Sequence, residues 1–179
     1  MIKRLIEGFR WTKRLKNERG AALVELALSV PLLLILVFGL IEFSQIIFSE
    51  QVMSGLTRQG SDLASRGTSL TDAVSALSTQ GASLNIGTKG RIIVTAVADV
   101  KGKPQIVDQA ESSTGISVTS EIGSGIGKPA SISSSANTVL AAGQTLYVTE
   151  VFYSYTPMTP IGNLLETSIG STLYQAAFF

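Results

Sequence analysis

The chain has 179 residues, enough for one domain and an anchoring segment, and its formal net charge is only +1. That value hides an asymmetry, because residues 1–20 carry seven basic and two acidic side chains, whereas the rest of the chain carries seven basic and eleven acidic ones. Cysteine and histidine are both absent, which excludes a disulfide framework, cysteine-liganded metal sites, and Cys–His or Ser–His–Asp catalysis.

The basic segment, residues 1–20, runs directly into an apolar one. Basic residues in a block are compatible with nucleic-acid binding, but the adjoining apolar run favours membrane lipid as the partner and no nucleic acid. Positive charge before an apolar segment is typical of an N-terminus held in the cytoplasm while the C-terminal part is translocated. We therefore expect a single-pass protein of the inner (cytoplasmic) membrane, with its C-terminal domain periplasmic or extracellular.

The apolar run Ala21–Ile41 contains only two strongly polar residues, Glu25 and Ser29. As a helix it would be about 31 Å long, close to the thickness of a bilayer's hydrocarbon core. A buried core helix of this length and uniformity is rare, and a secretory signal peptide would end at small residues that are missing here. The run predicts a transmembrane helix at residues 21–42 that stays attached as an anchor.

Two residues of this helix interrupt its apolar pattern. Pro31 removes one helical hydrogen bond and predicts a kink, although prolines are also ordinary in membrane helices. Glu25 has two interpretations. Its side chain reaches back to the cytoplasmic interface, or it pairs with a positive group that appears only in an assembly.

The N-terminal motif combines a basic leader, a glycine, a glutamate five residues later and a proline within the apolar run. The residues concerned are Glu18–Leu28, Pro31–Leu34 and Gly39–Glu42. This motif resembles the N-terminus of TadE-like proteins, the pseudopilins or minor pilins of tight-adherence (Flp-type) pilus systems, and the general class III prepilin signal. Residues 91–97 and 148–157 resemble the sheet segments of that family more loosely.

The resemblance implies processing and assembly. A membrane-embedded aspartyl prepilin peptidase would cut between Gly20 and Ala21, where glycine allows close approach of the backbone. Glu25 would become the fifth mature residue and pair with the new α-amine of a neighbouring subunit. The implied partners are the peptidase, other pilin and pseudopilin subunits, and the inner-membrane pilus assembly platform. The implied role is pilus assembly for surface attachment (cell adhesion).

Beyond Ile41 the helical pattern continues. The apolar positions are Ile46, Met53, Leu56 and Leu63, and the polar positions expected on other faces are Glu42, Gln45, Glu50, Gln51, Arg58 and Asp62. We expect one helix from about Ala21 to Ser65, ending near Gly67, with residues 43–66 as its periplasmic continuation. A short helix should follow at about 71–79, capped by Ser69 or Thr71 and broken by glycines at 81 and 87.

The remainder predicts a small sheet. Residues 91–98 and 104–109 should form a hairpin whose turn contains Gly102. Residues 111–138, rich in serine and glycine, are expected to form an exposed loop. Residues 145–155 form the strongest strand pattern, with its tyrosines on a face that we expect to be covered by the helix or a loop. Residues 164–173 predict a short helix or strand.

The predicted fold is therefore α+β and pilin-like: a long N-terminal helix with its first half in the membrane, and an antiparallel sheet domain within residues 67–179. We expect a structural protein, not an enzyme, with no cofactor or metal, and with its remaining acids solvated at the surface. Two alternatives stay open. One is an uncleaved, membrane-anchored periplasmic binding or adhesion module, and the other is a membrane-tethered hydrolase that uses two carboxylates.

Overall fold

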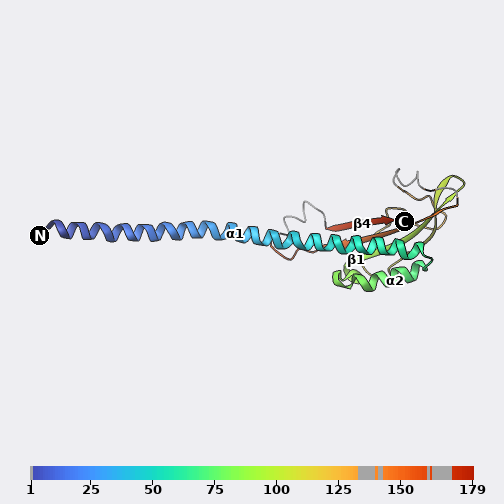
Figure 1. The fold of residues 1–179 in the computed structure, drawn as a ribbon, viewed down its shortest axis with the longest axis horizontal. Coiled ribbons are helices and arrows are strands. Elements are labelled where there is room, and N and C mark those ends of the chain that lie inside the picture. Colours follow the sequence, from blue (N-terminus) through green and yellow to red (C-terminus); the bar gives the residue numbers. More distant parts are fainter. Residues whose placement is uncertain (1, 133–139, 141–142, 161, 163–170) are drawn as a thin grey trace.

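The computed structural model describes residues 2–132, 140, 143–160, 162 and 171–179, and their side chains from Gly20 onward. One long helix carries a small domain beside its C-terminal part (Figure 1). The elements are α1 (Ile2–Ser65), α2 (Leu70–Gln80), the 3-10 helix η1 (Gly81–Leu84), α3 (Ile86–Lys89), β1 (Gly90–Val100), β2 (Lys103–Glu111), β3 (Thr145–Ser154) and β4 (Thr172–Phe178). The α+β class and the pilin-like arrangement are confirmed.

Helix α1 ends where the sequence predicts but begins much earlier. At its C-terminus the amide of Gly67 donates to Ala64 O (3.1 Å) and that of Thr68 to Leu63 O (3.2 Å), while Gly67 has φ 89°. These are the two hydrogen bonds of a Schellman cap, which glycine favours because it has no side chain to clash at positive φ. At the other end the helix starts at Ile2 instead of Ala21, since the leader is rich in good helix formers. The helix is continuous through Pro31, and the predicted kink stays a prediction.

The short helix after α1 is confirmed, and one of its two expected breaks is wrong. Ser69 caps α2 by accepting a hydrogen bond from the Asp72 amide at 3.1 Å. Gly81 ends α2 as expected. Gly87, however, lies inside α3, because the left-handed Asn85 (φ 52°) redirects the chain and a new helical turn begins there.

The sheet has the order β2-β1-β3-β4, with every neighbouring pair antiparallel. The predicted hairpin joins β1 to β2 through Lys101 and Gly102, which both have positive φ (58° and 78°) as in a type I′ turn. Past β4, Phe179 exchanges two hydrogen bonds of 2.9 Å with Tyr147, so the end of the chain belongs to the sheet. Of the helix or strand expected at 164–173, residues 164–170 lie outside the described residues.

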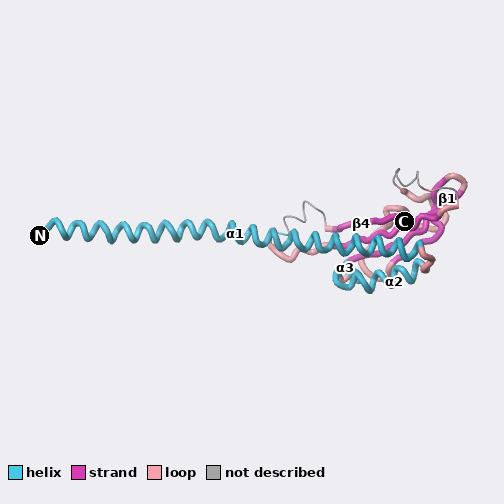
Figure 2. Tube along the Cα trace, viewed as in Figure 1, coloured by secondary structure: helices cyan, strands magenta, loops and turns pink. Residues whose placement is uncertain are grey.

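Helices α1 and α2 cover one face of the sheet (Figure 2). Val151 and Tyr153 of β3 pack there with Met53 and Leu56 of α1 and with Leu77 of α2. The tyrosine-bearing face is thus covered by the helices, as preferred from the sequence.

The loop expected to be exposed at 111–138 is mostly exposed in its described part, but a few of its residues are buried against the opposite face of the sheet. Within its described part, Ile122, Ala130 and Ile132 are buried and pack on Val97 and Val148. The physical reason is that both faces of the sheet are apolar while the helices cover only one of them. The loop therefore supplies the second apolar layer.

Candidate processing and assembly site

The bond predicted to be cleaved lies within α1, and both residues that form it are exposed. A Cβ atom added at Gly20 would meet no atom within 4 Å. Glycine in a helix interior also lowers local helix stability by about 1 kcal/mol relative to alanine, which eases local opening of the chain. Gly20 and Ala21 therefore form an accessible segment that costs little to unwind.

Glu25 lies one helical turn after Ala21, about 6 Å further along the axis and on the same face of the helix. Its side chain is exposed, and the two ion pairs among the described side chains, Arg66–Asp62 and Arg91–Glu111, do not involve it. Within the described part of the protein, this carboxylate at the start of the apolar run has no positive partner.

Most of the apolar run is exposed, and only Phe38 and Gly39 near its end are half-buried. Its thirteen exposed large apolar side chains are Leu23, Val24, Leu26, Leu28, Val30, Leu32, Leu33, Leu34, Ile35, Leu36, Val37, Leu40 and Ile41. Among the described residues, one helix is long and apolar enough to cross a membrane, and this run belongs to it. An exposed apolar surface of this size marks a region that lipid or protein has to cover.

Glu42 lies in an environment that the sequence pattern did not predict. Instead of lying on a solvated face, it is fully buried (0% exposed) where α1 enters the domain. Its Oε1 accepts hydrogen bonds from the Tyr155 hydroxyl and the Met158 amide (3.2 Å), and its Oε2 accepts from the amide and hydroxyl of Thr159 (3.0 and 2.6 Å). A buried carboxylate is tolerable when donors surround it in this way.

The segment after β3 is shaped around this carboxylate. A Cβ atom added at Gly162 would lie 2.5 Å from Glu42 Cδ and 2.5 Å from Pro157 Cβ, so only glycine fits. Burial, together with the hydrogen bond to Glu42, raises the pKa of the Tyr155 hydroxyl, which stays protonated as a donor. The residues 155–159 are thus pinned to α1 at its entry into the domain, and we call them the pinned loop.

A spacing in the sequence could have indicated this burial. Glu42 lies seven residues before Ser49, which in turn lies seven before Leu56, and all three are buried on one stripe of α1. Of the predicted apolar stripe, Met53 and Leu56 are buried but Ile46 and Leu63 are only half-buried, and its polar members were missed.

Glu150 is a second acid whose expected solvation is wrong, since it is 0% exposed. It lies on the sheet face away from α1, where it accepts hydrogen bonds from the Ser120 hydroxyl, the Glu121 amide (2.9 Å) and the Tyr174 hydroxyl (3.0 Å). Burial and the negative charge of Glu150 raise the pKa of Tyr174. Glu42 and Glu150 therefore lie in separate clusters, each supplied with neutral donors.

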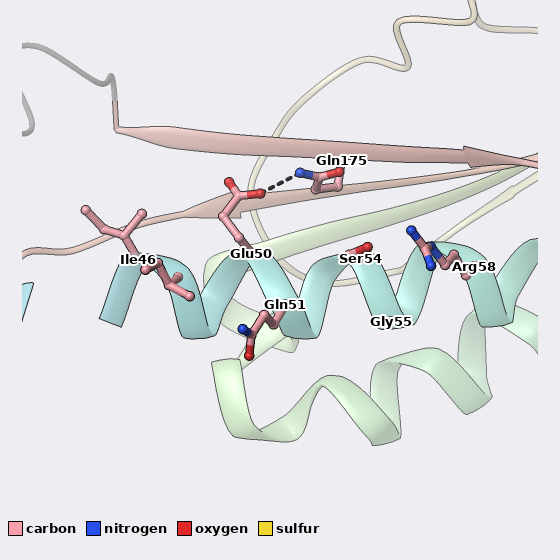
Figure 3. Close-up of a pocket in the computed structure, with 8 residues that line it drawn as sticks. Ile46, Glu50, Gln51, Ser54, Gly55, Arg58 and Gln175 are labelled. Atoms are coloured by element: carbon pink, nitrogen blue, oxygen red, sulfur yellow. Dashed lines mark hydrogen bonds between the residues drawn. The ribbon is translucent and has the colours of Figure 1, made fainter. Parts of the chain in front are cut away.

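An open groove runs between the exposed side of α1 and β4 (Figure 3). Gln175 of β4 points toward Glu50 of α1 and donates a hydrogen bond to it. Arg58, Gly55 and Ile46 line the same groove. It contains no cluster of catalytic groups, and no three acidic side chains in the described part of the chain come close enough to hold a metal ion.

The family comparison covers this helix. Residues 20–62 match a family model described as TadE-like protein. This part of α1, residues 20–62, is therefore similar to TadE-like proteins, and we call it the TadE-like segment. The match begins at Gly20, includes Glu25, Pro31 and Glu42, and ends shortly before the end of α1. The TadE-like segment thus contains both the mostly exposed apolar run and the buried carboxylate. No curated protein and no solved structure matches the chain.

Proposed function

We propose that this protein is a minor pilin or pseudopilin, a structural component in the assembly of a tight-adherence (Flp-type) pilus used for surface attachment. The observation that carries the proposal is the apolar part of the TadE-like segment, from Gly20 to Ile41, which is exposed except at the half-buried Phe38 and Gly39. Such a surface suits two successive environments: lipid after insertion, and other pilin helices after assembly.

The steps follow from the charge and exposure of α1. The chain inserts with its leader in the cytoplasm and its sheet domain on the periplasmic side. A prepilin peptidase then cuts between Gly20 and Ala21, removing seven basic and two acidic side chains and leaving a free α-amine on Ala21. Glu25, which has no described partner, pairs with the α-amine of a neighbouring subunit. In a low-dielectric environment such a pair favours one register of adjacent helices more clearly than it adds stability.

Processing is tested by coexpressing the full chain with a prepilin peptidase and sequencing the N-terminus of the product. We expect a mature chain that starts at Ala21, and an unprocessed chain when the peptidase carries an inactivating substitution. An intact Met1 in the presence of active peptidase would contradict the processing step. It would favour the alternative of an uncleaved, membrane-anchored binding or adhesion module.

Pairing is tested with Glu25→Ala and Glu25→Gln, both of which should be cleaved normally but assemble poorly. The matched control is Ser29→Ala, which changes an exposed polar residue one turn further along the same face of α1. Sheared pili and membrane fractions are quantified for each variant. Wild-type piliation in the Glu25 variants would contradict the pairing, whatever the outcome of the processing experiment.

The hydrolase alternative requires two carboxylates that act on one bond. The two fully buried ones, Glu42 and Glu150, lie in separate clusters, and hydrogen bonds from several donors engage each of them. This arrangement supports a structural role for both acids.

A further inference from the structure

Hydrophobic surface continues beyond the apolar run onto the base of the domain. Phe43, Ile47 and Phe48 are 59%, 41% and 46% exposed, on the first turns of α1 that follow Ile41. Met158, in the pinned loop, is 70% exposed. We call these four side chains, Phe43, Ile47, Phe48 and Met158, the basal collar.

Three of the polar side chains near the collar, those of Glu42, Ser44 and Ser49, make their hydrogen bonds inside the protein. Glu42 is the only charged residue between Glu25 and Glu50, and it is fully buried among four hydrogen-bond donors. The hydroxyls of Ser44 and Ser49 donate back to the carbonyls of residues 40 and 45, at 2.8 and 3.0 Å. Polar groups in a poorly hydrated environment need hydrogen-bond partners within the protein, because little water is available to supply them.

The length of the helix places the collar at a definite depth. If Ala21–Ile41 fills the hydrocarbon core, the next seven residues of α1 extend about 10 Å further. The polar interfacial layer on each side of a bilayer is about 5–8 Å thick. Phe43, about 3 Å past Ile41, therefore falls within that layer, the region where amphipathic and aromatic side chains collect, whereas Ile47 and Phe48, about 9 and 10 Å past Ile41, lie just beyond its outer limit.

We propose that the basal collar rests in the outer headgroup layer of the membrane that α1 spans, and that Glu42 positions the pinned loop on this lipid surface. The inference rests on the proposed membrane insertion. The occupant is the lipid interface because the collar continues the apolar run without a charged residue in contact with solvent between them. The domain then sits directly on the bilayer, and the first turns of α1 past the core are not a free stalk.

The test uses fluorescent probes on the full-length chain in lipid nanodiscs. Because the chain has no cysteine, each single-cysteine variant carries one label. Leu33→Cys probes the hydrocarbon core, whereas Phe43→Cys and Met158→Cys probe the collar. Ile126→Cys is the matched control, since Ile126 is 69% exposed and the next residue, Gly127, donates a hydrogen bond to the Ile106 carbonyl (2.7 Å) near the turn between β1 and β2. That turn is at the end of the domain away from the N-terminal part of α1 (Figure 1).

Quenching by lipids that carry a nitroxide at a deep or a shallow position, and by aqueous iodide, reports the depth of each probe. We expect deep quenching at Leu33→Cys, shallow-lipid quenching at Phe43→Cys and Met158→Cys, and only iodide quenching at Ile126→Cys. Collar probes that behave like the Ile126→Cys control would overturn the collar while insertion stands. Collar probes that neither lipid nor iodide quenches would show that another protein surface covers the collar, which would overturn its contact with lipid. A Leu33→Cys probe that the nitroxide lipids do not quench would overturn both the collar and the membrane insertion of α1.

The part played by Glu42 is tested in the Met158→Cys background. Glu42→Ala removes the acceptor of the pinned loop, so shallow-lipid quenching at residue 158 should fall to the level of the Ile126→Cys control. The Phe43→Cys probe, which lies on α1 itself, should keep its quenching in the same variant. Unchanged quenching at residue 158 would overturn the positioning role. A loss of shallow-lipid quenching at both residue 43 and residue 158 would show that Glu42→Ala changes the depth of α1 in the membrane, and it would overturn the specific positioning of the pinned loop by Glu42.

Discussion

Replacing Gly60 with alanine probes how closely α1 lies on the domain. Gly60 is buried where the helix passes over β3 and α2. A Cβ atom there would lie 2.6 Å from Leu77 Cδ1 and 2.7 Å from Thr149 Cγ2, well inside ordinary van der Waals contact. The hydroxyl of the next residue, Ser61, donates a hydrogen bond to the Ala177 carbonyl (2.9 Å) and shares a second hydrogen bond with the Thr149 hydroxyl (3.1 Å), so little lateral freedom is left to relieve the clash.

Two opposing effects set the expected change in the free energy of unfolding for Gly60→Ala. Alanine in place of an interior helical glycine stabilises by about 1 kcal/mol. Overpacking a well-filled core costs about 1–3 kcal/mol. Gly60→Ala should therefore lower the free energy of unfolding by about 0–2 kcal/mol. Gly55→Ala, five residues earlier on an exposed side of α1 with no atom within 4 Å of the new Cβ, should instead raise it by up to about 1 kcal/mol.

The difference between the two variants isolates the overpacking cost, since the gain in helix propensity cancels. We expect Gly60→Ala to be about 1–3 kcal/mol less stable than Gly55→Ala. Urea unfolding of the full chain in detergent micelles measures it through tyrosine near-ultraviolet circular dichroism. All four tyrosines, Tyr147, Tyr153, Tyr155 and Tyr174, lie in the sheet domain or directly after β3. Equal stability of the two variants would refute the close seating of α1 on β3.

Three further predictions concern buried polar contacts. Glu42→Ala should destabilise the domain by at least about 2 kcal/mol, because it leaves buried donors without an acceptor, and urea unfolding measures it. Ser61→Ala should cost about 1–2 kcal/mol in the same assay, through the loss of two hydrogen bonds. Burial, assisted by the carboxylates of Glu42 and Glu150, raises the pKa of Tyr155 and Tyr174 above that of an unfolded tyrosine, about 10. Above that pH the unfolded chain binds fewer protons than the folded one, so stability should fall as pH rises. Phenolate absorbance should then appear at these two residues only with unfolding, and ionisation of both near pH 10 in the folded protein would contradict their burial.

Much of the fold could be predicted because its signals are local. The end of α1 at Gly67, the cap by Ser69 and the turn at Gly102 each depend on a few adjacent residues. The two faces of β3 follow from simple alternation along the strand. The candidate processing motif at Gly20 and Glu25 is local as well, and it falls within the TadE-like match.

The burial of Glu42 and Glu150 could not be predicted, because it depends on distant segments. The hydroxyl that binds Glu42 comes from Tyr155, 113 residues further along the chain, and the Ser120 hydroxyl reaches Glu150 across 30 residues. An acid in a sequence is expected to face water unless several donors converge on it, and their convergence is a property of the tertiary fold. The same holds for the loop residues around Ile122, which became core because one sheet face had no helix to cover it.

The two acids of the TadE-like segment, Glu25 and Glu42, differ in a way that fits the proposed insertion into the membrane and the proposed assembly. Glu42 has all of its hydrogen bonds supplied by its own chain, so its burial needs no other molecule. Glu25 has no partner among the described side chains, and an apolar environment would penalise it until a positive group is supplied. An acid that is satisfied internally can fix how the domain meets the membrane. An acid that is left unsatisfied can instead select the neighbour that relieves it, which is why we assign orientation to Glu42 and assembly to Glu25.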